Sequence, residues 1–197
     1  MVHLGDFVAG WPLMNRVVGR EHFTEIADKL GLPVWSGRSE EVERVVVWFH
    51  ELGGIGGEIL WGQLIPEFKK LARCELRLVV DPRLLVMFKA SFPECEVVSR
   101  DESFEVLREG ADAFVFGREL TQLVVSKESD FHSISAHQCR LPEVQNGLSL
   151  AGHRKHIAIS WKTTNPASAM YRNIPLEKFA ETLAKFDCEF HCLQHGD

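Results

Sequence analysis

The sequence predicts an α/β protein in which a parallel sheet is covered by helices. Short runs of β-branched and aromatic residues alternate along the chain with amphipathic helical patterns, which is typical of strand–helix–strand units. The composition fits this class, because 45% of the 197 residues are apolar and 25% are charged, as in ordinary globular domains. A chain of this length can build one sizeable core, or one domain and part of another.

The first predicted strand and helix flank a glycine-rich segment. "RVVVWFH" (Arg44–His50) has the pattern of a buried strand, and "GGIGG" follows shortly after it. From Glu58 to Ala72, apolar residues recur at the spacing of one helical face. We expect Pro66 to bend this helix, because a proline cannot donate the backbone hydrogen bond to residue 62.

The same alternation continues along the next part of the chain. "ELRLVV" (Glu75–Val80) predicts a second strand, and Asp81–Phe92 predicts a helix with Asp81 as its N-cap and Pro82 at the first helical position. A further strand, a short helix and another strand are predicted at Glu96–Ser99, Glu102–Glu109 and Asp112–Phe116. Successive strands joined by helices favour a Rossmann-like parallel sheet with helices on both faces.

Residues 126 to 155 are polar and poor in strand patterns, which predicts a domain boundary. We expect an N-terminal linker or helical segment over 1–43, a Rossmann-like domain over 44–150 and the start of a second α/β domain over 151–197. The last segment holds a predicted strand, helix and strand at His156–Trp161, Pro175–Phe186 and Glu189–Gln194. About 45 residues rarely build an independent core, so this segment should dock on the first domain, bind another chain such as a second copy in a homo-oligomer, or be marginally stable.

Charge and hydropathy exclude several classes of protein. The net charge is −6 and the 22 basic residues are scattered, so no nucleic acid is expected as a partner. No apolar run approaches the roughly 18 residues of a membrane span and the N-terminus lacks a signal pattern, so we expect a cytoplasmic protein without a transmembrane segment. Five widely spaced cysteines are expected to be reduced thiols.

The glycine-rich segment is the first candidate site. It follows a strand and opens a helix, where backbone N–H groups and the helix dipole favour a polar or anionic ligand. This predicts ligand-facing roles for Gly54, Gly56 and Gly57; the alternative is a tight turn with close packing. The dinucleotide fingerprint is broken, because its third glycine would fall at Ile59, and helix capping explains Asp81 without a ligand.

A second candidate site follows the predicted strand at His156–Trp161. The segment after this strand carries a cation, two hydroxyls and an amide, on Lys162, Thr163, Thr164 and Asn165, and Arg172 precedes the next helix. Such donors suit a phosphate or diphosphate group, and the alternative is a solvated connecting loop.

The C-terminal histidines and cysteines have the spacing of metal ligands but are not expected to bind one ion. Cys188 and Cys192 should face one side of a strand and His191 the other, so a tetrahedral ion could not collect them together with His195. No metal site and no cofactor are therefore predicted. No Gly-x-Ser-x-Gly elbow of a serine hydrolase occurs either.

Seven segments of the chain together resemble one known family. They are "GDFVAGWPL" (Gly5–Leu13), "LPVWSG" (Leu32–Gly37), "GGIGGEILWGQLIPEF" (Gly53–Phe68), "VVDPRLLVMFKASFP" (Val79–Pro93), "ISWKTTN" (Ile159–Asn165), "YRNIPLEKFA" (Tyr171–Ala180) and "CLQHGD" (Cys192–Asp197). In this order they resemble the glycosyltransferase domain found behind tetratricopeptide repeats in many bacterial proteins. That domain is related to the ADP-heptose:lipopolysaccharide heptosyltransferases of glycosyltransferase family nine.

The resemblance implies a GT-B fold, in which two Rossmann-like domains face each other across a cleft. The first domain would hold mainly a glycan or surface acceptor, and the second mainly a nucleotide-sugar donor. Transfer would be inverting and metal-independent: a carboxylate in the glycine loop would deprotonate the acceptor hydroxyl, and the second domain would stabilise the departing diphosphate. Matched by motif, the diphosphate would contact Lys162, Thr163, Thr164 and Arg172.

The chain departs from the family pattern in two ways. The loop aspartate of the family is replaced by Gly57, which leaves Glu58, expected in the first turn of the helix, as the candidate base. The sequence also resembles a family member truncated at both ends, so weak turnover or none is expected. The alternative function is a non-catalytic binding or assembly module derived from a transferase half. A nucleotide-dependent oxidoreductase or methyltransferase is disfavoured by the broken fingerprint.

Overall fold

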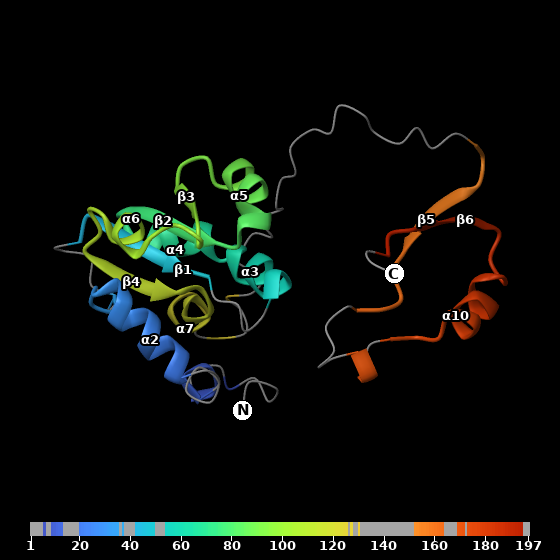
Figure 1. Cartoon of the computed structure of the whole chain (residues 1–197), viewed down its shortest axis with the longest axis horizontal. Helices are drawn as coiled ribbons and strands as arrows, with labels where there is room; N and C mark the ends of the chain where they lie inside the picture. Colours follow the sequence, from blue (N-terminus) through green and yellow to red (C-terminus); the bar gives the residue numbers. More distant parts are fainter. Residues whose placement is uncertain are drawn as a thin grey trace. The chain divides into compact units, whose positions relative to one another are not determined.

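The computed structural model describes residues 6, 9–13, 20–35, 37, 42–49, 54–125, 127, 130, 152–163, 169–171 and 173–194. The chain divides into two compact units, Met1–Glu143 and Val144–Asp197, which Figure 1 shows in colours that follow the sequence. The boundary predicted between residues 150 and 151 lies outside the described residues. No helix in the described part is both long and apolar enough to cross a membrane.

The first unit is built on a four-stranded sheet of order β3-β2-β1-β4. Its strands are β1 (Arg44–Trp48), β2 (Glu75–Val80), β3 (Glu96–Ser99) and β4 (Ala113–Phe116). Every neighbouring pair is parallel, and the central strand β1 pairs Val45 with both Leu76 and Ala113. The structure confirms the Rossmann-like α/β fold and the four strands that the sequence predicts.

Helices cover both faces of this sheet (Figure 1). One face packs against α3 (Gly54–Gly62), α4 (Ile65–Ala72), α5 (Leu85–Ser91) and α7 (Leu120–Val124). The other face packs against α2 (Arg20–Leu30) and α6 (Phe104–Arg108). Two short 3-10 turns, η3 (Pro82–Leu84) and η4 (Gly117–Glu119), lead into α5 and α7.

Strand β1 shows why the predicted strands are rich in apolar residues. Val45 and Val47 pack into the core on the α4 face, whereas Val46 and Trp48 pack into the core on the α2 face. Since successive side chains of a strand point to opposite faces, a sheet covered on both sides favours apolar residues at consecutive positions. The two cores hold the strands in one register, so their carboxyl ends finish together at one edge.

The glycine-rich segment differs from the predicted loop. Helix α3 already begins at Gly54, whose φ of +58° suits a residue without a side chain, so Gly56 and Gly57 are helical. Glu58 is consequently the fifth residue of α3 and lies in its second turn; its predicted place in the first turn was wrong. A glycine-rich helix start has little intrinsic propensity, and packing on the sheet stabilises it instead.

The single bent helix predicted over 58–72 is two helices. Helix α3 ends at Gly62, and α4 begins at Ile65 with Pro66 in its first turn. A proline is tolerated there because the first N–H groups of a helix have no intrahelical acceptor. Pro66 therefore starts a helix instead of bending one.

The second unit is a small strand–helix–strand arrangement. Strands β5 (Lys155–Ile159) and β6 (Cys188–Cys192) form a parallel pair, and α10 (Leu176–Leu183) lies between them in the chain. No residue of α10, β5 or β6 is buried. A two-stranded sheet without a core is marginally stable, in line with the expectation from the length of this segment.

Two glycines of α3 allow a direct test of its packing. A Cβ added at Gly62 would lie 2.9 Å from the ring of Phe88, which is fully buried, whereas a Cβ at Gly56 would meet no atom within 4 Å. We expect Gly62→Ala to lower the free energy of unfolding by about 1–3 kcal/mol through overpacking. Gly56→Ala should raise it by up to about 1 kcal/mol through helix propensity. Urea denaturation of the two variants measures both values, and equal effects would contradict the packing described for α3.

Candidate site at the carboxyl ends of the strands

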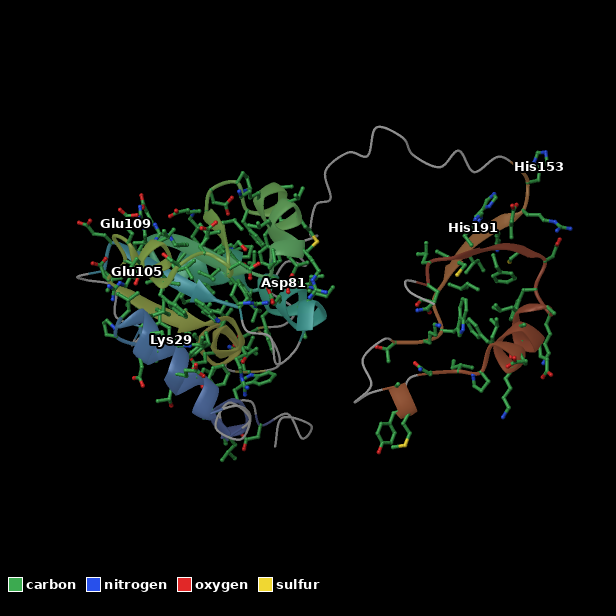
Figure 2. The ribbon with its side chains drawn as sticks, viewed as in Figure 1. Lys29, Asp81, Glu105, Glu109, His153 and His191 are labelled. Carbon is green, nitrogen blue, oxygen red and sulfur yellow. The ribbon has the colours of Figure 1, made fainter. Side chains whose placement is uncertain are left out.

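Three parallel strands each place one polar group at the same edge of the sheet. The groups are the backbone oxygen of Phe49 after β1, the carboxylate of Asp81 after β2 and the guanidinium of Arg100 after β3. Asp81 is labelled in Figure 2. Glu58 joins them from α3, which follows β1 and covers one face of the sheet. The carboxyl edge of a parallel sheet is where α/β proteins commonly bind ligands.

The Arg100 guanidinium connects these segments. Its Nη1 donates to the backbone oxygen of Phe49 at 2.7 Å and to Glu58 Oε1 at 2.9 Å, and its Nη2 donates to Asp81 Oδ2 at 3.1 Å. Only 10% of the Arg100 side chain is exposed. A buried guanidinium is stable only when its donors are paired, so Arg100 fixes the ends of β1 and β2 relative to α3.

Glu58 is fully buried, and both of its oxygens accept hydrogen bonds. Oε1 accepts from Arg100, and Oε2 accepts from the backbone N–H of Asp81 at 2.9 Å. Burial raises the pKa of Glu58 above its ordinary value, and the hydrogen bonds from Asp81 and Arg100 oppose that shift. Glu58 therefore holds a proton more tightly than a solvated glutamate does.

Asp81 has the opposite electrostatic character. Its carboxylate accepts from the Arg83 side chain at 2.8 and 2.9 Å and from the Arg83 backbone N–H at 3.0 Å. Chiefly the hydrogen bonds from the Arg83 side chain lower the pKa of Asp81 to about 2. The contact with the Arg83 N–H confirms the predicted N-cap. Helix capping alone would account for Asp81, yet its carboxylate also forms part of this charged cluster.

These residues line a pocket of about 380 Å³. The lining consists of Gly54, Glu58, Asp81, Pro82, Arg83, Arg100 and Asp101. Carboxylates accept hydrogen bonds from hydroxyls and guanidinium groups donate to oxygen, so the pocket suits a ligand rich in hydroxyl groups. Of the candidate residues of the glycine-rich segment, Gly54 and Glu58 line this pocket, whereas Gly56 and Gly57 are not among the lining residues.

Arg100 was missed in the sequence because its partners come from distant segments. The available signal was its position directly after a predicted strand, the same signal that drew attention to Asp81 and Lys162. Nothing in the local sequence indicates that Arg100 would meet Glu58, which lies 42 residues earlier.

In the second unit, Lys162 and Thr163 follow β5 at the carboxyl end of that strand. Gln194, just after β6, holds this turn: its Oε1 accepts from the Lys162 N–H at 3.1 Å, and its Nε2 donates to the Lys162 backbone oxygen at 3.1 Å. The Thr163 N–H donates to Asn173 Oδ1 at 2.6 Å. The other residues predicted to contact a diphosphate, Thr164, Asn165 and Arg172, lie outside the described residues.

No family model matches the chain, and no curated protein matches it. Two solved structures are similar to it. One is the dodecameric iron-containing heptosyltransferase TibC in complex with ADP-D-β-D-heptose, at a TM-score of 0.45 and 14% identity. The other is the bacterial iron-containing dodecameric glycosyltransferase TibC from enterotoxigenic E. coli H10407, at a TM-score of 0.44 and 14% identity. Each match covers 84% of this chain and 45% of the other, so this chain spans less than half the length of those proteins.

The buried ion pair between Glu58 and Arg100 should contribute strongly to stability. Glu58→Gln removes one of the two carboxylates that pair with Arg100 and leaves Asp81 as its remaining counterion, so we expect the free energy of unfolding to fall by about 2 kcal/mol or more. Glu75→Gln is a matched control, because Glu75 also pairs with an arginine, Arg44, but its side chain is 71% exposed. That change should cost less than about 1 kcal/mol in urea denaturation. Similar losses for the two variants would show that the Glu58 pair is not the structural centre of the site.

The low pKa of Asp81 predicts a pH-dependent contribution to stability. Because the pKa falls from an ordinary 3.8 to about 2 on folding, the stabilisation is complete above the unfolded value and is lost as the pH falls through the folded value. We expect Asp81→Asn to destabilise the protein at about pH 6 and to approach the wild type toward about pH 2.5. Asp101→Asn, at an exposed position of the same pocket, should change stability little at either pH. A difference for Asp81→Asn that does not shrink on acidification would contradict this assignment.

Proposed function

We propose that this chain is glycosyltransferase-like, and that it transfers a sugar from a nucleotide-diphosphate donor to a glycan or surface acceptor by an inverting, metal-independent reaction. The observation that carries the proposal is the pocket of carboxylate and guanidinium groups at the carboxyl edge of the first sheet. Parallel sheets bind ligands at this edge, and side chains of this kind recognise sugar hydroxyls. The pocket would hold the acceptor.

Glu58 is the candidate base of this reaction. Its raised pKa makes it a stronger proton acceptor than a solvated glutamate, whereas the low pKa of Asp81 makes that residue a weak one. Each carboxylate oxygen can accept two hydrogen bonds, so Oε1 and Oε2 retain acceptor capacity beyond the bonds from Arg100 and Asp81. Arg100 would act as a positioning residue that aims the carboxylate at the pocket.

The turn after β5 is the candidate donor site. Hydrogen bonds with Gln194 and Asn173 fix its backbone, and the Lys162 ammonium and the Thr163 hydroxyl are the candidates to contact a diphosphate. A cation at this point would stabilise the negative charge that develops on the departing diphosphate. The sequence motif alone assigns diphosphate contacts to three further residues, Thr164, Asn165 and Arg172.

The alternative function is a non-catalytic binding or assembly module. It is favoured by the apolar side chains that the second unit exposes, among them Met170 (77% exposed), Tyr171 (81%), Phe186 (59%) and Leu193 (64%). Side chains of this size commonly take part in contacts with another chain. Such a module would bind a protein partner or a second copy without binding a nucleotide sugar.

Calorimetric titration with UDP, GDP and ADP sugars tests the donor site. We expect one of these nucleotides to bind, and Lys162→Ala to raise its Kd at least about tenfold through loss of a charge-assisted contact. Lys178→Ala is the control, since Lys178 is an exposed lysine on α10 of the same unit. An unchanged Kd for Lys162→Ala would overturn the donor site. Failure of all three nucleotides to bind, together with self-association in light scattering, would favour the assembly module.

A further inference from the structure

Strands β5 and β6 bring two histidines and a glutamate onto one face of the second unit. The parallel register pairs His156 with Glu189 and Ala158 with His191, so His156, Glu189 and His191 share a face. Cys188 and Cys192 alternate with them and point to the opposite face. In Figure 2, the labelled His191 lies on the side of the strands away from α10.

The potential ligand atoms of these three residues lie close together. His156 Nδ1 is 2.9 Å from His191 Nε2 and 3.7 Å from Glu189 Oε2, and one ligand atom from each residue lies within 4.8 Å of the others. The second ring nitrogen of His156, Nε2, is buried and has no hydrogen-bond partner among the described residues. His156 therefore presents Nδ1 to the cluster.

We propose that His156 Nδ1, His191 Nε2 and the Glu189 carboxylate bind a first-row divalent transition metal ion such as Zn²⁺. Imidazole and carboxylate groups bind these ions at about 2.0–2.2 Å, so two ligands of one ion lie about 3–4 Å apart. His156 Nδ1 lies at about this separation from His191 Nε2 and from Glu189 Oε2. Without metal, one of the two facing nitrogens donates a hydrogen bond to the other. Metal binding needs a lone pair on both, so the donor's proton would move to the other nitrogen of its own ring or be released to water.

The exposure of His156 and Glu189 is compatible with a metal ion that enters the site from solvent. The His156 side chain is 13% exposed, which holds its ring in place, and that of Glu189 is 55% exposed, so its carboxylate can turn toward the ion without loss of packing. Three protein ligands leave a further coordination position for water.

The ion would cross-link strands β5 and β6, because its ligands come from both of them. No residue of β5, β6 or α10 is buried, so this unit lacks the core that usually holds two strands together. An ion that binds only the folded unit stabilises it in proportion to the logarithm of metal concentration over Kd. This role is separate from the proposed sugar transfer and does not depend on it.

Titration of the metal-stripped full chain tests the site. We expect Zn²⁺ to bind in calorimetry. His156→Gln and His191→Gln should each raise the Kd for Zn²⁺ by more than about 100-fold, because loss of an outer-shell partner already costs about 10- to 100-fold. His153→Gln is the matched control, because His153 is an exposed histidine of the same unit outside the cluster, and its Kd should equal that of the wild type. An unchanged Kd for His191→Gln would overturn the proposal.

Two further measurements keep the test decisive if a variant fails to fold. Co²⁺ bound to the wild type should give visible d–d absorption without a thiolate-to-cobalt charge-transfer band, because the cysteines of β6 point away from the cluster. A charge-transfer band that disappears in Cys188→Ser would assign the metal to sulfur and overturn the proposal. In nitrogen-15 NMR of the wild type, Zn²⁺ should shift His156 Nδ1 and His191 Nε2, and unshifted resonances would also overturn it.

Discussion

The hydrogen bonds of one buried guanidinium hold the candidate acceptor pocket together. Arg100 follows β3, yet it binds the backbone after β1, the carboxylate of Glu58 on α3 and the carboxylate of Asp81 after β2. A buried positive charge is costly unless every donor finds an acceptor, so these segments are constrained to one arrangement. The glycine-rich start of α3 has little helix propensity of its own and depends on such tertiary contacts.

Two carboxylates that share one arginine acquire different properties in this pocket. Asp81 is surrounded by donors, above all the exposed Arg83 side chain, and its negative charge is stabilised. Glu58 lies deeper, where desolvation outweighs its hydrogen bonds and raises its pKa above the ordinary value. Pairs of acids whose pKa values are moved apart are typical of functional sites, because they separate a group that binds from a group that exchanges a proton.

The second unit depends on polar contacts instead of a core. Gln194 after β6 holds the turn after β5, and the histidines of both strands meet on one face. Each contact joins residues more than 30 positions apart, so the candidate donor turn keeps its shape only while the two strands stay paired. A metal ion on the histidine face would therefore support the turn indirectly by stabilising the strand pair.

The sequence by itself determined the elements whose cause is local. Apolar runs identified the strands, and Asp81 before Pro82 identified a helix start. Tertiary structure decided what depends on packing and register: the break between α3 and α4, and the place of Glu58 in the second turn of α3. It also decided the contacts of Arg100 with Glu58, 42 positions apart, and of His156 with His191, 35 positions apart. The first pair meets through packing of α3 on the sheet and the second through strand pairing. Strand alternation correctly separated His191 from the cysteines of β6, but only the pairing of β5 with β6 supplied its partner.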